Sequence, residues 1–358
     1  MIMCNDMIKK EISSELIGLS KISVTSVVDT LGIDTFAGVV VDVLQGKNVR
    51  RFTEILTRTR LIQSYKELID FFDILEKNHG IPPHKVLELS KNKLLDSKIP
   101  REYKPIYYWL VGLTEKQTQN VLRGNFSKDF DELVEKTTAI LQENSSSDKQ
   151  LDLLYILMVC GAQTLTIRGS EKSLHGKYFE KLILGCICQL LGFKLVNSKE
   201  KQDKLQKLFF LSYQDEVNRE CDATLIHESR AIKIDIGFIG KGNPEITLDK
   251  ISRFSKEAEI FGKRVNVKTM VIVDSIGSQS RLYEDAKRVD TSVFCMSESN
   301  WLLKLAAEIS EVFSINNPFH QIRESQIRGD ELWQSQFNNL LLEKIKGMEV
   351  PLSDLITL

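Results

Sequence analysis

The residues of greatest chemical interest lie in one hydrophobic stretch, positions 219–245, which reads RECDATLIHESRAIKIDIGFIGKGNPE. Apolar and polar residues alternate on both sides of positions 227–230, which predicts a β-hairpin with its turn there. Successive side chains of a strand point to opposite faces, so Lys233 and Asp235 share one face of the second strand and Asp222 lies on one face of the first. The charges of the hairpin therefore gather on one side, opposite a row of isoleucines.

Asp222 and Asp235 are expected to approach each other across adjacent strands. Two carboxylates held close together repel each other unless a cation lies between them. Carboxylate, water and phosphate oxygens suit Mg²⁺ in particular. Such a metal activates a water molecule and neutralises charge on a phosphodiester, so the pair predicts phosphodiester hydrolysis. The alternative interpretation is a half-exposed hairpin whose polar face is simply solvated.

Further residues extend the predicted site. A lysine beside the metal can orient or deprotonate the water and stabilise the pentacovalent phosphate, and Lys233 and Lys241 are both candidates. Lys241 and Asn243 lie in a glycine-rich segment, where the backbone can come near a phosphate before a helix begins. Glu180 lies upstream on a long predicted helix, one turn after Gly176, where that helix can be approached closely.

The elements that position these residues follow two patterns. Residues 1–143 are predicted to be helical throughout; at 62–77, for example, apolar residues recur at three- and four-residue steps and His79-Gly80 ends the helix. The second half predicts helices at 151–160, 170–191, 246–261, 280–288 and from 299, and strands at 193–196, 208–213, 219–226, 231–239, 269–273 and 292–296. This order predicts an α+β (mixed α/β) fold, a mixed sheet with helices on its faces.

The segment from Asn144 to Asp148 is short and polar, which predicts a linker. The predicted domains are residues 1–146, helical and considered for DNA contact, residues 150–316, which carry the chemistry, and a helical extension at 317–358. Ser127 is expected to cap a helix at 130–141, and Ser170 or Ser173 to cap the helix that ends near 191.

Composition limits the class of protein. A net charge of -1 and 42% hydrophobic residues describe an ordinary globular chain and argue against a generally basic, histone-like binder. The six cysteines form no CxxC pair, so free thiols in a reducing cytosol are expected rather than a zinc site. Neither a signal peptide nor an apolar stretch near the ~20 residues needed to span a bilayer is apparent. The protein is therefore expected to have no membrane partner and to lie in the bacterial cytoplasm.

Two basic segments are candidates for contact with DNA. The first crowds cations into a short helical stretch opposed only by Glu54, which can track phosphates or can form a solvated helix face: Lys47, Arg50, Arg51, Arg58 and Arg60. The second lies near the C-terminus and combines Arg323 and Arg328 with Gln321 and Gln326. Arginine and glutamine are the side chains that read guanine and adenine edges in the major groove.

A helix with Glu180, a hairpin with Asp222 and Asp235, then a helix and a strand resembles the αβββαβ core of PD-(D/E)xK nucleases. Within that superfamily, the segments HGKYFEKLILG and ECDATL…IKIDIGFIGKGNPEITLDKISRF look most like type II restriction endonucleases of the CfrBI kind. The resemblance covers about residues 165–300 and is not extended over the helical first half.

The resemblance implies roles for single residues. Asp222 stands at the first aspartate of the motif and Asp235 at its second acid, so both would hold Mg²⁺, with Glu180 assisting. The family's lysine belongs two residues after the second acid, where this chain has Gly237. Lys241 or Lys233 would supply the missing ammonium group, with Lys241 slightly preferred. If neither does, the domain is catalytically altered or inactive.

The sequence therefore favours a Mg²⁺-dependent type II restriction endonuclease. It would cut both strands of a short palindromic site in double-stranded DNA as a homodimer, because a two-fold symmetric enzyme matches a two-fold symmetric substrate. A cognate DNA methyltransferase is expected as a functional partner. Two alternatives remain open: a structure-specific repair or junction nuclease with the same core, and a non-catalytic protein that binds DNA or a partner.

Overall fold

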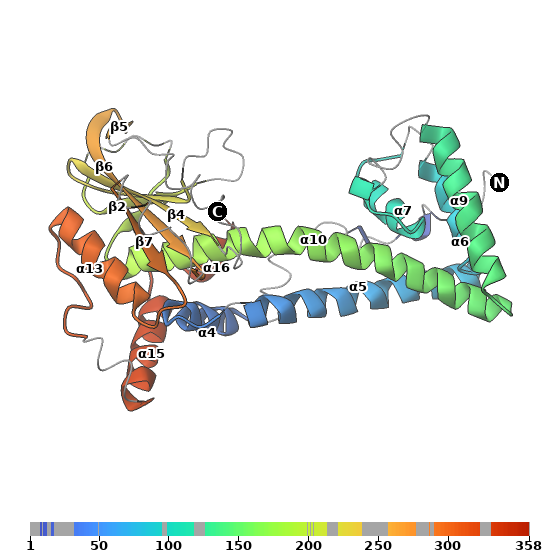
Figure 1. The fold of residues 1–358 in the computed structure, drawn as a ribbon, viewed down its shortest axis with the longest axis horizontal. Helices are drawn as coiled ribbons and strands as arrows, with labels where there is room; N and C mark the ends of the chain where they lie inside the picture. The colour runs from blue at the N-terminus through green and yellow to red at the C-terminus, as the bar shows by residue number, and fades with distance from the viewer. Residues whose placement is uncertain are drawn as a thin grey trace. The chain divides into compact units, whose positions relative to one another are not determined.

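The chain forms two compact units in the computed structural model (Figure 1). The helical unit comprises Met1–Ser23 and Thr53–Ser173, and the sheet unit comprises Val24–Phe52 and Leu174–Leu358. Of residues 51, 126–127, 170–175, 257, 331–333 and 356–357 the structure describes the backbone only. Including these, the described residues are 8, 10–12, 16–17, 32–48, 50–94, 99–117, 126–198, 200, 202, 204–212, 221–237, 257–276, 286, 290–322 and 331–357.

The helical unit is built on two long helices. These are α5 (Arg50–His79) and α10 (Asp148–Leu190), and the first residues of α5 and the last of α10 belong to the sheet unit. The core of the helical unit gathers large side chains such as Phe71, Trp109 and Tyr155. The shorter helices of this unit are α6 (Lys85–Leu94), α7 (Lys104–Leu110) and α9 (Phe126–Glu143).

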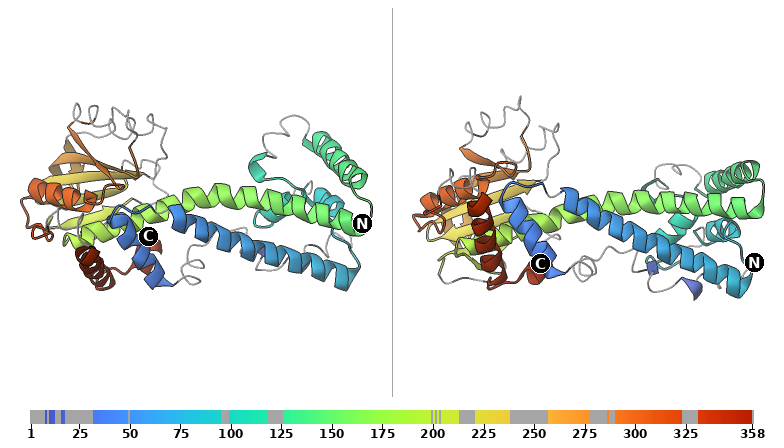
Figure 2. Two further views of the ribbon diagram at one scale, coloured as in Figure 1. Left: turned by 60° about the horizontal axis from the view of Figure 1, so that its bottom comes forward. Right: turned by 90° about the horizontal axis from the view of Figure 1, so that it is seen from below.

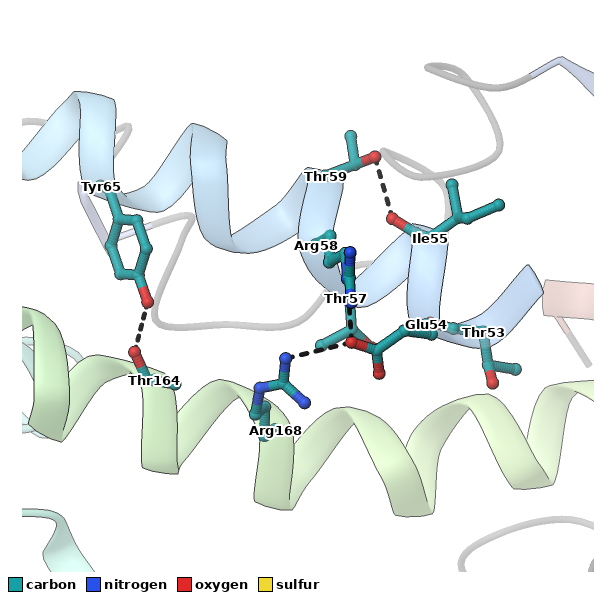
Figure 3. A network of polar contacts seen from close by, with 9 residues as sticks. All are labelled: Thr53, Glu54, Ile55, Thr57, Arg58, Thr59, Tyr65, Thr164 and Arg168. Carbon is teal, nitrogen blue, oxygen red and sulfur yellow. Dashed lines mark hydrogen bonds and ion pairs between the residues drawn. The ribbon is translucent and has the colours of Figure 1, made fainter. Parts of the chain in front are cut away.

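Polar contacts fix α5 against α10 within the helical unit (Figure 3). Tyr65 and Thr164 form a hydrogen bond between their hydroxyls. Glu54 accepts hydrogen bonds from Arg58 at 3.0 Å and from Arg168 at 3.1 Å. These two guanidinium groups, that of Arg58 first, lower the pKa of the Glu54 carboxyl. Glu54 therefore joins a neighbour on its own helix to a residue of the other helix.

The sheet unit contains a seven-stranded mixed sheet in the order β1-β2-β3-β4-β6-β5, with β7 also paired to β6. β3 pairs antiparallel with β2 and β4, whereas β4, β6 and β7 run parallel to one another. The strands are β1 (Lys194–Leu195), β2 (Leu208–Leu211), β3 (Ala223–His227), β4 (Arg230–Gly237), β5 (Glu257–Ile260), β6 (Lys263–Val273) and β7 (Thr291–Cys295).

The long strand β6 carries two partners on its edge away from β4. β5 pairs with its beginning, so that Ile260 faces Lys263, and β7 pairs with its end, so that Val273 faces Cys295. The hairpin between β5 and β6 turns through Phe261 and Gly262, whose φ angles are 52° and 74°. Two successive positive φ values are those of the type I′ turn, whose twist matches that of the strands.

Helices lie along one side of the sheet in Figures 1 and 2. They are the part of α10 after residue 173, α4 (Ile33–Leu44), α15 (Glu331–Lys346) and α16 (Leu352–Thr357), and α13 (Trp301–Phe313) packs against β4 and β7. Trp301 is fully buried and donates a hydrogen bond to the carbonyl oxygen of Val43 at 2.9 Å. Phe36 and Phe179 stack, and Phe52 packs edge-to-face against both, which joins the start of α5 to α4 and α10.

The predicted fold class is confirmed as mixed α+β, but several boundaries differ. Residues 144–147 form a turn between α9 and α10 within the helical unit, and so do not separate the two units. The backbone N–H of Gln150 binds the Ser147 hydroxyl at 3.3 Å, so this polar run starts the next helix. The single helix α10 replaces the two helices expected at 151–160 and 170–191, and Ser127 lies inside α9. The prediction of a helix at 246–261 is wrong at its C-terminal end, because residues 257–260 form strand β5 and pair with β6.

One segment, Asp148–Gly169 of α10, is long and apolar enough to cross a membrane by length and composition. The expectation that no apolar stretch approaches this length was therefore wrong. Its residues Leu151, Tyr155 and Val159 are buried in the protein, and Tyr155 donates a hydrogen bond to the carbonyl of Leu110 at 2.6 Å. Leu153, Leu157 and Leu165 of the same segment are more than half exposed, so one face of this helix packs into the core and the opposite face does not.

Gly46 offers a test of the packing between α4 and the loop before α13. Its φ is 86°, and a Cβ there would lie 2.8 Å from the Glu298 carbonyl oxygen, which as a backbone atom cannot rotate away. Gly32 has a similar φ of 79° but open space around it. We expect Gly46→Ala to lower the free energy of unfolding by about 1–3 kcal/mol more than Gly32→Ala, as overpacking does. Equal losses in urea titrations would contradict this.

The five described cysteines are free thiols, as the sequence predicted. Burial raises the pKa of the Cys186 and Cys188 thiols far above their usual range. Because the thiolate is the reactive form, we expect iodoacetamide to modify the half-buried Cys160 well before these two in the native protein. Mass spectrometry of tryptic peptides measures the order, and protein unfolded in guanidinium serves as the control. Simultaneous labelling of all three would show that α10 is open to reagent.

Candidate active site

The predicted hairpin is present and is formed by β3 and β4. His227 pairs with Arg230, which leaves Glu228 and Ser229 as a two-residue turn. Glu228 has a φ of 55°, a conformation that few non-glycine residues adopt outside tight turns. This short connection fixes the register, so that Thr224 faces Lys233 and Ala223 faces Ile234.

Asp222 is bound to the backbone of β4 on both sides of Asp235. Its amide donates to the carbonyl oxygen of Ile234 at 3.0 Å, and its Oδ2 accepts from the amide of Ile236 at 2.8 Å. Asp222 and Ala223 therefore both face Ile234, which is the two-against-one pattern of a β-bulge. The bulge brings the Asp222 carboxylate to the peptide group that follows Asp235. Asp222, directly before β3, and Asp235 of β4 thus lie at the same end of the hairpin.

Asp222, Lys233 and Asp235 are buried, whereas Glu228 and Arg230, in and beside the turn, are exposed. Their exposed fractions are 5% for Asp222, 8% for Lys233 and 6% for Asp235, and that of Thr224 is 1%. These values exclude the half-exposed hairpin with a solvated polar face. Burying ionised groups is costly unless they are paired or bind an ion. Solubility does not explain why these charged side chains lie at buried positions, whereas a chemical function would.

A third acid lies at the same end of the sheet and was missed in the sequence. Asp274 directly follows β6, and its amide donates to the carbonyl of Gly237 at 3.2 Å. Its Oδ2 lies 3.1 Å from Nη2 of Arg50, at the beginning of α5. Desolvation raises the pKa of the Asp274 carboxyl, and Arg50 opposes that rise. The sequence did carry a signal for Asp274: it directly follows the apolar run TMVIV, and the C-terminal ends of parallel strands lie at one edge of a sheet.

Helix α10 carries Glu180 beside a wall of buried apolar residues. Glu180 is half-buried, and the adjacent Lys181, which the sequence analysis did not name, is 8% exposed. The described residues contain no group of three or more His, Cys, Asp or Glu side chains that could hold an ion. The role expected for Glu180 beside Asp222 and Asp235 therefore stays a prediction.

The basic residues before and within α5 do not form one continuous free face. Lys47 pairs with Asp42 at 2.6 Å, Arg58 with Glu54 at 3.0 Å and Arg50 with Asp274 at 3.1 Å. Arg60 is buried, with 7% of its surface exposed. Asp42 and Glu54 are close in sequence to the cations that they oppose, and only the pairing of Arg50 with Asp274, 224 residues away, could not be found by counting charges along the chain. The side chain of Arg51 and residues Lys241, Asn243 and Arg323 lie outside the described part of the chain.

Comparison with known proteins decides the family. The family model of the CfrBI restriction endonuclease matches residues 34–281. The type II restriction enzyme CfrBI of Citrobacter freundii is 44% identical over 318 residues, which cover 85% of this chain and 89% of that enzyme. The chain belongs to the CfrBI restriction endonuclease family. No solved structure matches it.

Membership of the CfrBI family confirms the resemblance and widens it. The match begins at residue 34, so α4 and much of the helical unit belong to the family, where the sequence analysis had stopped near residue 165. As a member of this family the chain is a site-specific deoxyribonuclease of the restriction type. It is therefore an enzyme that binds and hydrolyses DNA.

Proposed function

We propose that the enzyme cuts both strands of a short palindromic DNA site with Mg²⁺, at a PD-(D/E)xK-type centre formed by Asp222 and Asp235. One observation carries this proposal: Asp222 binds the β4 backbone at both Ile234 and Ile236 and so holds its carboxylate beside Asp235. A mixed sheet flanked by helices, with the acids on adjacent strands, agrees with the core of that superfamily.

The donor set fits magnesium. Mg²⁺ keeps several of its waters and binds proteins through one or two carboxylates plus substrate phosphates. Two buried aspartates match that requirement. When bound, the ion would supply an activated water and positive charge on the phosphodiester.

The chain's own residues would hold and orient the reaction. Asp222 and Asp235 would fix the ion, and the Ile236 amide fixes the orientation of Asp222. Lys233 lies two residues before Asp235 and is buried on the same face of β4, where its ammonium group would offset one of the two carboxylate charges and act on the water and the phosphate. Lys241 and Asn243 remain proposed for contact with water, phosphate or base. Glu180 of α10 is proposed to assist Asp222 and Asp235 in holding the ion.

Symmetry and location complete the proposal. A homodimer would bring one centre to each strand of a palindromic site. Arg51, Arg58 and Arg323 remain proposed contacts to the DNA backbone. We propose a bacterial cytoplasmic location and a cognate DNA methyltransferase that protects the host's own sites.

The deciding experiment is digestion of unmethylated phage DNA by the purified protein, with Mg²⁺ and with EDTA. Discrete fragments that require the metal would establish site-specific, Mg²⁺-dependent cleavage. Sequencing of the fragment ends then shows whether the site is palindromic. A smear would overturn the sequence-specific assignment in favour of a structure-specific nuclease. Intact DNA in every divalent metal would favour a protein that binds without cutting.

A further inference from the structure

The strand end beside Asp235 lacks a side chain at the position where a motif lysine would stand. Gly237, the last residue of β4, pairs with Val273 of β6, and the next residue of that strand, Asp274, donates its amide to the Gly237 carbonyl at 3.2 Å. Asp274 is therefore bonded directly to the residue that replaces the lysine. Any cation held by Asp274 lies at the same strand end as the two buried aspartates.

Arg50 is that cation. Its Nη2 lies 3.1 Å from Asp274 Oδ2, although 224 residues separate the two in sequence. The exposed fractions of the two side chains differ: 59% for Arg50 and 18% for Asp274. The carboxylate is thus the more enclosed partner, and much of the arginine surface is open to solvent, where a phosphate could reach it.

The backbone around Arg50 is also fixed. The backbone N–H of Arg50 donates a hydrogen bond to Oδ1 of Asn48 at 2.8 Å. Gly46, four residues earlier, packs against the backbone of Glu298. Phe52, two residues later, packs on Phe36 and Phe179. The start of α5 is therefore held within the sheet unit, and Asp274 directs the side chain.

The chemistry favours a phosphate as the ligand. Arginine stays charged at all working pH values, and its planar fork matches two phosphate oxygens at once. An exposed ion pair adds only about 0–1 kcal/mol to the stability of a protein. The pair with the exposed Arg50 therefore does little to offset the cost of removing the Asp274 carboxylate from water. Desolvation raises the pKa of Asp274 despite the arginine, which agrees with an acid placed for a purpose other than stability.

We propose that Arg50 contacts the scissile phosphate and supplies there the positive charge that Gly237 cannot. Asp274 is its positioning residue. This inference rests on the proposed centre at Asp222 and Asp235, and it adds to that centre a residue from the opposite end of the chain. It assigns Arg50 to the reacting phosphate and not merely to the flanking DNA backbone.

The test measures binding and cleavage separately, on a duplex that contains the site mapped with the wild-type enzyme. Variants Arg50→Ala, Arg50→Lys and Asp274→Asn are compared in single-turnover cleavage at saturating enzyme with Mg²⁺, and in DNA binding with EDTA. Lys304→Ala is the matched control, because Lys304 forms an exposed ion pair with Glu298 in the same unit. Thermal unfolding of each variant verifies the fold.

We expect Arg50→Ala to slow single-turnover cleavage by about 100-fold or more, as loss of one charge-stabilising donor does, with a much smaller change in Kd. Arg50→Lys should retain part of the rate, and added guanidinium at concentrations far below denaturing should partly restore Arg50→Ala. Asp274→Asn should slow cleavage less, and should add nothing in the Arg50→Ala background. Lys304→Ala should behave as wild type.

Three outcomes would overturn the inference. An unchanged single-turnover rate with weakened binding would make Arg50 an ordinary backbone contact. Losses that multiply in the double variant would show that Asp274 acts independently of Arg50. A folded Arg50→Ala enzyme with neither defect would make the ion pair structural. Asp235→Asn, measured in parallel, separates the two proposals: if it cleaves normally, the proposed centre itself is wrong.

Discussion

Replacing Asp235 by asparagine is expected to abolish DNA cleavage while the protein stays folded and continues to bind DNA. The amide has the shape of the carboxylate but loses the charge that holds a hard cation. Loss of a metal-binding charge at the reacting phosphate should reduce the single-turnover rate by at least about 1,000-fold, the upper range for one electrostatic contact. Asp222→Asn should have a comparable effect, and its remaining oxygen can still accept from the Ile236 amide.

Stability should respond in the opposite direction to activity. The two aspartates are 5% and 6% exposed and lie together at one strand end, so removing one charge relieves repulsion and desolvation. The metal-free variants should therefore unfold at the same temperature as wild type or higher. The matched control is Asp73→Asn on the exposed surface of α5, where an i,i+4 pair with Lys77 is lost and cleavage is kept.

Full cleavage by either variant would remove the acids of β3 and β4 from the reaction. Loss of cleavage together with a collapsed melting curve would show instead that the acids are needed for folding. Circular dichroism and DNA binding in EDTA, measured on the same preparations, distinguish these results.

Magnesium itself should stabilise the wild-type enzyme and have little effect on the Asp235→Asn variant. A ligand that binds only the folded state raises the unfolding free energy by about 2.7 kcal/mol at a concentration of 100 times its Kd. Wild-type protein should thus melt at a higher temperature in Mg²⁺ than in EDTA, without DNA present. The size of the shift should depend on the logarithm of the metal concentration.

Matched ionic strength is required, because salt alone changes surface electrostatics. A melting shift of equal size in wild type and Asp235→Asn would place the bound metal elsewhere in the molecule. Absence of any shift in wild type, with cleavage still dependent on Mg²⁺, would mean that the ion enters only with the DNA phosphates.

The sequence was sufficient to predict the hairpin and its two acids, because alternation of apolar and polar residues and a two-residue turn are local signals. The order of strands after residue 190 was also predictable in outline. The helix predicted up to residue 261 failed at 257–260, where pairing with the long strand β6 overrides a polar, helix-like composition. Likewise, Asn144 and the serines after it resemble a linker, because the same residue types start helices.

The rest of the candidate site depends on contacts between distant segments. Alternation placed Asp222 on a face of β3, but only the bulge opposite Ile234 shows that its carboxylate reaches the β4 backbone. Asp274 and Arg50 are 224 residues apart, and no spacing rule joins them. Burial of Lys233 and Lys181 was equally invisible, since lysine is almost always exposed.

The sheet unit is assembled from two separate stretches of chain, and this affects how the protein is made. Helix α4 leaves the ribosome early, whereas its partner Trp301 follows more than 250 residues later. At typical synthesis rates that interval lasts on the order of ten to fifty seconds. During it, the apolar face of α4, with Phe36, Val40 and Leu44, has no sheet unit to join. The sheet unit can therefore be completed only when translation is nearly finished.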